Sequence, residues 1–226
     1  MPLAIKDKVS EELNRLVKEG VLEKVDFSDW AAPIVPVRKG DGNIRVCGDY
    51  KVTINPAMHQ QEYPLPRPDE LFAQLQGGQK FSKLDLSNAY LQIVLDPDSR
   101  KYVTINTHLG LFQYTRLPFG VSSAPAIFQQ CMDQILGGLN GVGCYLDDII
   151  VTGKTDEEHL RNLGQVVKKL DEVGLRLKES KCSFFQDSIE YLGFIVDAKG
   201  IHPSPAKVEA VVNAPAPQKS RNCNHS

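Results

Sequence analysis

The sequence predicts an α+β fold in which a mainly antiparallel sheet packs on helices. Short apolar runs typical of strands are mixed with longer segments of helical periodicity, and no regular strand–helix–strand alternation is present. The chain has 226 residues, of which 42% are hydrophobic, enough for one large domain or two small lobes. No apolar run reaches membrane-spanning length, so we expect a globular protein without a membrane partner.

The first part of the chain is expected to contain two helices and a β-hairpin. Residues 5–20 place apolar side chains at helical spacing and end at Gly20, as a helix C-terminal cap would. Residues 30–50 contain two apolar runs joined by KGDGN, which predicts a hairpin with a basic, glycine-rich tip. Residues 66–78 have proline early and glycine late, which predicts a short helix.

The central part is expected to alternate strands with one helix. Residues 81–95, FSKLDLSNAYLQIVL, are predicted to open as a strand, to break around Ser87 and Asn88, and to resume as a strand. Residues 101–107 and 111–120 predict a strand pair. Residues 122–138 predict a helix that two glycines close.

The last part is expected to hold a long helix and further strands. Thr155 and Glu158 form a capping box sequence at the start of that helix. The apolar positions that follow the box are Leu160, Leu163, Val167 and Leu170, and the helix is expected to end at Gly174. Residues 189–196 and a continuation past DAKG predict strands, followed by a helix that has Pro205 at its first position. The polar residues 213–226 are expected to be a disordered or aberrant tail.

Charge and cysteine content exclude little. The net charge of −2 argues neither for nor against nucleic acid, because acidic faces can offset a basic groove. The five cysteines are widely spaced and lack Cys-x-x-Cys pairing, so we expect reduced, structural thiols. The first residues lack the pattern of a secretory signal, so we expect a cytoplasmic location, with the nucleus or particles as alternatives.

Two adjacent carboxylates interrupt the strand-like segment GCYLDDIIV at residues 143–151. Like charges in a buried segment repel unless a cation neutralises them or they share a proton. Asp147 and Asp148 therefore predict a metal site, and Mg²⁺ prefers such oxygen ligands together with substrate phosphates. Asp85, at the end of another apolar strand, is the best candidate for a further ligand. The alternative is a turn that exposes both neighbouring acids to water.

Three of these segments resemble reverse transcriptases, the RNA-directed DNA polymerases. YLDDIIV at 145–151 resembles their strand–turn–strand signature, and KLDLSNAYLQIVL at 83–95 resembles their first catalytic motif. LPFGVSSAPAIFQQCMDQIL at 117–136 is similar to their template-positioning helix motif. The order of the three motifs along the chain is that of the family.

Further motifs extend the resemblance from about residue 9 to residue 212. GLRLKESKCSF at 174–184 and YLGFIVDAKGI at 191–201 resemble the lysine-bearing motif and the primer-grip hairpin. Residues 30–55 are similar to the fingers region of gypsy-type long-terminal-repeat retrotransposon enzymes. The resemblance implies a right-hand polymerase with fingers in residues 1–80. Residues 81–212 would be palm with intervening fingers segments and the start of the thumb. We expect the rest of the thumb, the connection and RNase H to be absent.

The resemblance also implies two-metal nucleotidyl transfer on a template with its primer. Asp85, Asp147 and Asp148 would be the catalytic acids and, together with the Leu86 backbone, would hold two Mg²⁺ ions, for which Mn²⁺ can substitute. The implied partners are RNA or DNA template with primer, deoxynucleoside triphosphates and possibly other domains of an element polyprotein.

The nucleotide would be bound by the fingers and by the first palm motif. The residues implied are Arg38, Lys39, Arg45, Leu86, Ser87, Tyr90, Phe119 and Lys181. Arg45 offers bidentate donors to phosphate, and the ring of Tyr90 would exclude a 2′-hydroxyl. The alternatives are a solvated basic loop for the hairpin cations, a solvent lysine for Lys181, and core packing for the two aromatic rings.

The template and primer would contact a second group of residues. The resemblance implies Pro118, Gly120, Tyr191, Leu192 and Gly193 for this role. The alternative for the last three is a plain hydrophobic strand. Two other functions stay open: a relic or co-opted module that binds nucleic acid without extending primers, and an unrelated metal-dependent phosphohydrolase.

Overall fold

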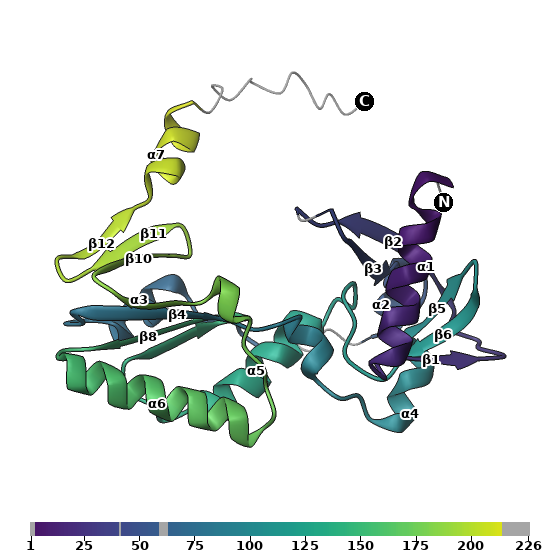
Figure 1. The fold of residues 1–226 in the computed structure, drawn as a ribbon, viewed down its shortest axis with the longest axis horizontal. Coiled ribbons are helices and arrows are strands. Elements are labelled where there is room, and N and C mark those ends of the chain that lie inside the picture. The colour runs from purple at the N-terminus through teal and green to yellow at the C-terminus, as the bar shows by residue number, and fades with distance from the viewer. Residues whose placement is uncertain (1–2, 41, 59–62, 214–226) are drawn as a thin grey trace, which may run out of the picture.

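The computed structural model describes residues 3–40, 42–58 and 63–213. They form two lobes that lie side by side in Figure 1. The strands of these residues make three sheets, of five, four and three strands. The prediction of an α+β fold with mainly antiparallel sheets is confirmed, and the one parallel pair described joins β2 to β5.

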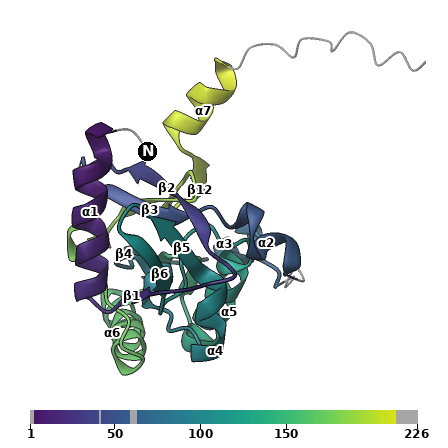
Figure 2. The ribbon, with the colours of Figure 1, turned by 90° about the vertical axis from the view of Figure 1, so that its right-hand side faces the viewer.

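The first lobe is a five-stranded sheet covered by helix α1 (Leu3–Lys18), as Figures 1 and 2 show. Its strand order is β1-β6-β5-β2-β3. The strands are β1 (Leu22–Val25), β2 (Ala32–Arg38), β3 (Ile44–Gly48), β5 (Thr104–Thr107) and β6 (Gly110–Tyr114). Short helices connect them: η1 (Tyr50–Val52), α2 (Ile54–Ala57), α4 (Pro97–Arg100) and η3 (Lys101–Val103). The apolar face of α1 packs on the sheet and closes this core.

The second lobe is a four-stranded sheet in the order β7-β8-β4-β9. The strands are β4 (Lys80–Asp85), β7 (Val142–Tyr145), β8 (Asp148–Gly153) and β9 (Ser183–Gln186). Helices α5 (Ala124–Leu136) and α6 (Asp156–Glu172) cover one face. The register of β4 and β8 sets Asp85 opposite Asp148, so one end of the sheet carries acids on neighbouring strands.

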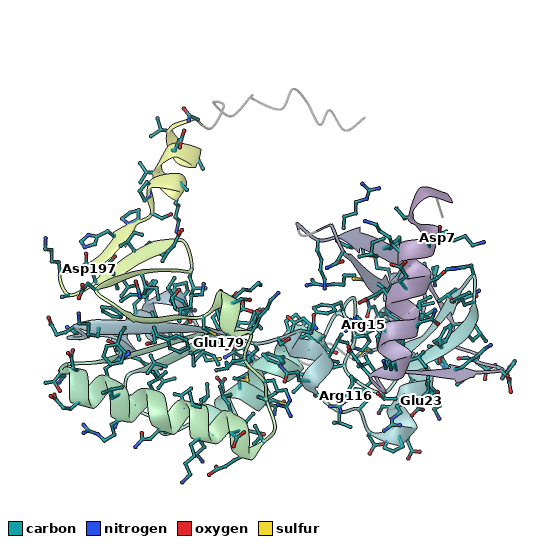
Figure 3. All side chains as sticks on the ribbon, viewed as in Figure 1. Asp7, Arg15, Glu23, Arg116, Glu179 and Asp197 are labelled. Atoms are coloured by element: carbon teal, nitrogen blue, oxygen red, sulfur yellow. The ribbon has the colours of Figure 1, made fainter. Side chains whose placement is uncertain are left out.

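The other face of this sheet packs against helix α3 (Pro68–Gln74) and the third sheet. That sheet is a meander of β10 (Ser188–Tyr191), β11 (Phe194–Asp197) and β12 (Gly200–Pro203). Successive residues of β8 serve both cores, since Ile149 and Val151 face α5 and α6 whereas Ile150 faces α3. Side chains fill these layers (Figure 3), and α7 (Pro205–Val212) projects away from both lobes in Figure 1.

One prediction about local structure was wrong. After Asn88 the chain forms a 3-10 helix, η2 (Ala89–Gln92), in place of a resumed strand. Asn88 is left-handed, with φ of 49°, and the Ser87 amide bonds to Arg176 O at 3.0 Å, so the chain turns out of the sheet.

The helix predicted after Thr155 is confirmed as α6, and two of its apolar side chains face solvent, since Leu160 and Val167 are 56% and 41% exposed. His159 and Asn162 are buried in their place. They find partners in the sheet, Ser82 Oγ at 2.8 Å and Thr152 O at 2.8 Å, and these bonds rotate polar positions inward.

The remaining predictions have mixed outcomes. The first helix, the β2–β3 hairpin and the β5–β6 pair are confirmed. Four cysteines lie in the described residues, and all four are free thiols. In the same residues no helix is long and apolar enough to cross a membrane. The predicted tail lies outside the described residues from 214 onward.

Candidate active site

A cavity of about 750 Å³ lies between the β2–β3 hairpin of the first lobe and the acid-bearing end of the second. It brings together many of the predicted site residues: Arg38, Lys39, Arg45, Asp85, Leu86, Ser87, Tyr90, Phe119, Asp147 and Lys181. Residues far apart in sequence thus meet at one place. The cavity combines carboxylates, cations and two aromatic rings.

The two acids of the cavity emerge from buried strands. Asp85 ends β4 directly after Leu84, which is fully buried. Asp147 sits exposed in the tight turn between β7 and β8, just before Ile149 and Ile150, which are also fully buried. Leu146 in that turn has φ of 54°, a conformation that is uncommon for a residue other than glycine. The structure therefore fixes the acids at the edge of a rigid core.

Asp148 pairs with Asp85 across β4 and β8 but is not among the residues that line the cavity. Its carboxylate Oδ1 is 3.0 Å from Lys83 Nζ, and its backbone oxygen accepts a hydrogen bond of 3.2 Å from the Tyr191 hydroxyl. Over residues 3–40, 42–58 and 63–213, no group of three or more His, Cys, Asp or Glu side chains is placed to hold a metal ion. A metal-ligating role for Asp148 stays a prediction.

Asp85 is held by the segment that precedes β9. Lys181 Nζ lies 3.2 Å from its carboxylate, which is only 17% exposed. The Lys178 amide donates to the Asp85 backbone oxygen at 2.8 Å, and the Asp85 amide donates to Cys182 Sγ at 3.4 Å. Lys178 also lines the cavity, which the sequence analysis missed. Its position three residues before Lys181, across one turn of η4 (Glu179–Lys181), was the available signal.

The residues present fit a divalent cation. Carboxylates of Asp85 and Asp147 line one cavity, and hard oxygen donors of this kind, completed by substrate phosphates, suit Mg²⁺. A cationic ammonium group, that of Lys181, already lies against Asp85, so positive charge is favoured at this point. Asp85, Asp147 and the Leu86 backbone are the groups that could hold such an ion.

Tyr90, Phe119 and Arg45 form a stack at the cavity wall. The Arg45 guanidinium lies 4.3 Å above the centre of the Phe119 ring, and the Tyr90 and Phe119 ring centres are 5.2 Å apart. Arg45 Nε is buried and has no hydrogen-bond partner in the described part of the chain. Burial, and secondarily the charge of Asp147, raises the pKa of Tyr90, so its hydroxyl stays protonated. Tyr90 also packs on Phe128, as the core-packing alternative expects, and exclusion of a 2′-hydroxyl by its ring stays a prediction.

Pro118 and Gly120 do not line the cavity and have structural roles. Pro118 is buried. Gly120 has φ of 104°, and a side chain there would overlap the Gly48 carbonyl oxygen. Asn55 bridges the same loop, since its amide donates to Gly120 O at 3.0 Å and accepts from the Ser122 amide at 3.0 Å. Their proposed contact with template stays a prediction.

Tyr191, Leu192 and Gly193 lie at the β10–β11 turn and do not line the cavity. Tyr191 is fully buried beside Phe72, and Leu192 and Gly193 adopt left-handed backbone conformations that make the turn. Burial raises the pKa of Tyr191, whose hydroxyl donates to the backbone of Asp148. Contact with a primer stays a prediction for all three.

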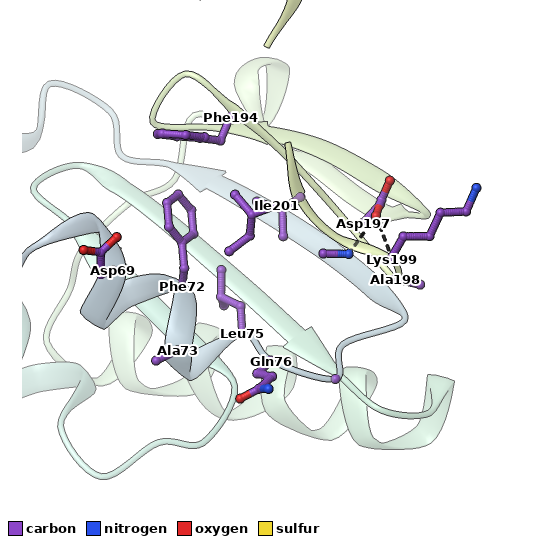
Figure 4. Close-up of a pocket in the computed structure, with 13 residues that line it drawn as sticks. Asp69, Phe72, Ala73, Leu75, Gln76, Phe194, Asp197, Ala198, Lys199 and Ile201 are labelled. Carbon is purple, nitrogen blue, oxygen red and sulfur yellow. Dashed lines mark hydrogen bonds between the residues drawn. The ribbon is translucent and has the colours of Figure 1, made fainter. Parts of the chain in front are cut away.

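A second cavity of about 650 Å³ lies between α3 and the β11–β12 hairpin (Figure 4). Its floor is apolar, formed by Phe72, Leu75, Phe194 and Ile201, with Asp69 and Lys199 among the polar residues of its lining. None of the predicted site residues lines it. The predicted acids and cations therefore meet in the first cavity and not in this one.

Residues 37–196 match the family described as reverse transcriptase (RNA-dependent DNA polymerase). An uncharacterized protein of Caenorhabditis elegans, K02A2.6, is 42% identical over 97% of this chain and 17% of its own length. The Retrovirus-related Pol polyprotein from transposon 297 of Drosophila melanogaster is 36% identical over 97% of this chain and 21% of the polyprotein. The chain therefore spans about a fifth of the length of these curated relatives.

Solved structures of foamy viral protease-reverse transcriptase have the same fold. The complex with double-stranded DNA matches with a TM-score of 0.85 at 27% identity, over 94% of this chain and 37% of that chain. The complex with an RNA/DNA hybrid matches with a TM-score of 0.83 at 26% identity, over 96% of this chain and 29% of that chain. Because the family match covers well over half of the chain, this protein belongs to the reverse transcriptase family.

Proposed function

We propose that this chain is the fingers-and-palm part of a gypsy-type retrotransposon reverse transcriptase that performs template-directed DNA synthesis by two-metal nucleotidyl transfer. The first lobe would be the fingers and the second the palm. The observation that supports the proposal most directly is the single cavity in which the carboxylates of Asp85 and Asp147 face the cations of the β2–β3 hairpin. Opposite charges across one cavity suit a substrate that carries both a metal and a triphosphate.

Asp85 and Asp147, with the Leu86 backbone, are the groups that would hold Mg²⁺, or Mn²⁺ in its place. When bound, the two ions would lower the pKa of the primer 3′-hydroxyl and neutralise the triphosphate. Asp148 would be the supporting acid, held by Lys83 at 3.0 Å. The strands beneath the two cavity acids fix their carboxylates, and a fixed arrangement lowers the entropic cost of reaching the transition state.

The hairpin and the first motif would bind the nucleotide. The Arg45 guanidinium, which lines the cavity and packs on Phe119, would offer paired donors to phosphate oxygens. Arg38 and Lys39 would add charge, and the backbone of Ser87 would contact phosphate oxygens. Tyr90 would hold its ring under the sugar and exclude ribonucleotides. Lys181, now beside Asp85, would protonate the leaving pyrophosphate.

The proposed substrates are deoxynucleoside triphosphates and an RNA or DNA template with its primer. The foamy viral relatives bind double-stranded DNA and RNA/DNA hybrid, and they share the fold that would carry the same duplex here. Other domains of an element polyprotein would supply further contacts to the duplex. We propose the cytoplasm, the nucleus or element particles as the site of action.

A second candidate function is nucleic-acid binding without primer extension. It is favoured by two ion pairs, Lys181 with Asp85 and Lys83 with Asp148, because ammonium groups neutralise these acids without any metal. In such a module the acids would be structural, and replacing them would leave the only activity, duplex binding, unchanged.

Primer extension with the purified chain separates the two functions. The parent is expected to extend a DNA primer on RNA and DNA templates only when Mg²⁺ is present. Asp85→Asn is expected to abolish extension, whereas Asp187→Asn, an exposed acid that pairs with Lys80 at the far end of β4, should extend normally. Extension that survives Asp85→Asn would contradict the assigned chemistry, and binding without any extension by the parent would favour the second function.

A further inference from the structure

The turn that carries Asp147 has a backbone conformation that needs support. Leu146 has φ of 54°, in the left-handed region that a leucine adopts only at an energetic cost. A turn of this kind persists only where surrounding contacts fix it. Because Asp147 follows Leu146 directly, those contacts also set the direction of the Asp147 carboxylate.

Gln129 of α5 supplies these contacts. Its side chain is fully buried, and its Oε1 accepts a hydrogen bond of 2.7 Å from the Leu146 amide. Its Nε2 donates to the Cys144 carbonyl oxygen at 3.0 Å. One amide group thus bonds the chain on both sides of Tyr145, at the end of β7 and within the turn. Donor and acceptor are both used, so neither a shorter nor an apolar side chain can replace it.

A second residue orients the Gln129 amide. Gln129 Nε2 donates to Asp133 Oδ1 at 2.8 Å, one helical turn further along α5. Asp133 Oδ2 in turn accepts a hydrogen bond of 2.7 Å from the Tyr63 hydroxyl. Asp133 is exposed, so this chain of bonds runs from the protein surface to the buried side of the Asp147 turn. A carboxylate at this point permits only an amino group as its neighbour, which fixes the amide in one of its two orientations.

We propose that Gln129, oriented by Asp133, is a positioning residue that fixes the Asp147 carboxylate for catalysis. The role in catalysis rests on the proposed function, whereas the support of the turn does not. The bonds of Gln129 reach only backbone atoms of the turn and leave the cavity to substrate. Small displacements of a catalytic group can lower a rate about a hundredfold.

The test compares Gln129→Ala with Gln134→Ala, the same substitution at an exposed position of the same helix. The exchange rate of the Leu146 amide proton, measured by NMR, reports the turn directly and needs no activity. Primer extension gives kcat, KM for the deoxynucleotide and the Mg²⁺ concentration at half-maximal rate. Thermal unfolding shows whether each variant is folded.

Gln129→Ala is expected to speed Leu146 exchange at least about tenfold, because the amide loses its acceptor. It should lower kcat about 10- to 100-fold and raise the Mg²⁺ requirement, with KM for the nucleotide little changed. Gln134→Ala should match the parent in every measurement. A folded Gln129→Ala protein with parental Leu146 exchange would overturn the proposal, as would faster exchange with parental kcat and Mg²⁺ dependence.

Asp133 variants keep the proposal testable if Gln129→Ala does not fold. Asp133→Asn can still accept from Gln129 and should keep parental exchange at Leu146, whereas Asp133→Ala should speed it severalfold. Equal exchange in both variants would reject the orienting role of Asp133. If the parent itself extends no primer, the proposed function fails, and the exchange rates still decide whether Gln129 and Asp133 hold the turn.

Discussion

The two walls of the candidate active-site cavity are built on very different supports. The carboxylate wall, Asp85 and Asp147, stands on strands whose neighbouring residues Leu84 and Ile149 are fully buried. The cationic wall, Arg38, Lys39 and Arg45, stands on the β2–β3 hairpin, where the side chains of β2 after Ala32 are half-buried or exposed. One wall has a core on both faces of its sheet, and the other is a hairpin at the edge of its sheet.

This difference matches what each wall would have to do. Carboxylates that share metal with a reacting hydroxyl need fixed positions, and a buried sheet provides them. Long basic side chains reach phosphate oxygens through several rotatable bonds, so a less rigid support suffices. Arg45 lies between these two cases of rigid and flexible support. Its guanidinium packs on Phe119, but its Nε lacks a hydrogen-bond partner among the described residues.

The largest expected effect distinguishes the roles of the two neighbouring acids, Asp147 and Asp148. Asp147→Asn should lower kcat at least a few hundredfold, because a cavity acid on the rigid wall is lost, by analogy with the loss of a fixed charge-stabilising group. Asp148→Asn should cost at least about tenfold less, since its carboxylate lies against Lys83 and outside the cavity. The check is kcat for primer extension at saturating Mg²⁺, with thermal unfolding as the control for folding. Equal losses would mean that Asp148 also reaches the reacting groups.

The next effect concerns the cationic wall. Arg45→Ala should raise KM for the deoxynucleotide about 10- to 100-fold with a smaller change in kcat, since a charge-assisted contact to phosphate is lost. Arg45→Lys should recover little, because an ammonium group cannot reproduce both the fork of donors and the stacking on Phe119. Steady-state kinetics with varied nucleotide measure both. A loss confined to kcat would place Arg45 in support of the carboxylate wall.

The carboxylate wall could be predicted from sequence because the signal is local. Charged residues directly flanked by strand-like apolar runs, as at Asp85 and Asp147, have few structural explanations, and the buried flanks are confirmed. The cations of the hairpin were predicted only by resemblance, since a basic loop of this composition is also a common solvated turn.

Other features depended on contacts that no local pattern encodes. Tyr90 was placed on a strand, but Asn88 and the bond of Ser87 to Arg176 turn the chain into a 3-10 helix. Gln129 was missed because a glutamine within an amphipathic helix usually faces water. Its role depends on the approach of the β7–β8 turn, which only the folded chain shows.

A smaller effect is expected on the affinity for duplex, and it tests the cationic wall alone. Replacing Arg38 and Lys39 together by Gln should weaken duplex affinity about tenfold at 0.1 M salt and reduce the salt slope by about 1.8, if each neutralises one phosphate. The control is Lys168 and Lys169 on α6, which do not line the cavity, replaced by Gln in the same way. Affinity measured at several salt concentrations gives the slope. An unchanged slope would limit the hairpin to nucleotide contacts.

Sugar selection would test the stack that joins the two walls. Tyr90→Val should raise ribonucleotide relative to deoxynucleotide incorporation about tenfold, a typical value when steric exclusion in a pocket is lost. Tyr90→Phe should keep the parental ratio, because the ring itself would exclude the 2′-hydroxyl. The Tyr90 hydroxyl, whose pKa is raised by burial, stays neutral and adds no charge. Competition between the two nucleotides in primer extension measures the ratio. A parental ratio for Tyr90→Val would make the ring a packing residue against Phe119 and Phe128.

The smallest expected effect is on stability, and it concerns the core behind the carboxylate wall. His159 of α6 bonds to Ser82 of β4 at 2.8 Å, three residues before Asp85, and its Nδ1 is buried without a partner in the described chain. Burial lowers the pKa of His159, and the charge of Asp156 opposes this only in part. The folded state therefore binds a proton at His159 less readily than the unfolded state. The contribution of neutral His159 to the free energy of unfolding is complete above about pH 6.5 and is lost as the pH falls below that value.

The unfolding midpoint of the parent should accordingly decrease by about 2–5 °C more between pH 7.5 and 5.5 than that of His159→Gln. The variant is less stable at pH 7.5 but has no imidazole to protonate. The control is His202→Gln, at an exposed histidine that lies 3.3 Å from Asp197 in the third sheet. Its unfolding midpoint should show the parental pH dependence that His159 causes. Equal pH dependence of the parent and His159→Gln would show that His159 gains no proton on unfolding. The expected result would instead mean that neutral His159 stabilises the packing of α6 on β4, the strand that ends at Asp85, whereas the hairpin has no histidine between Ala32 and Gly48.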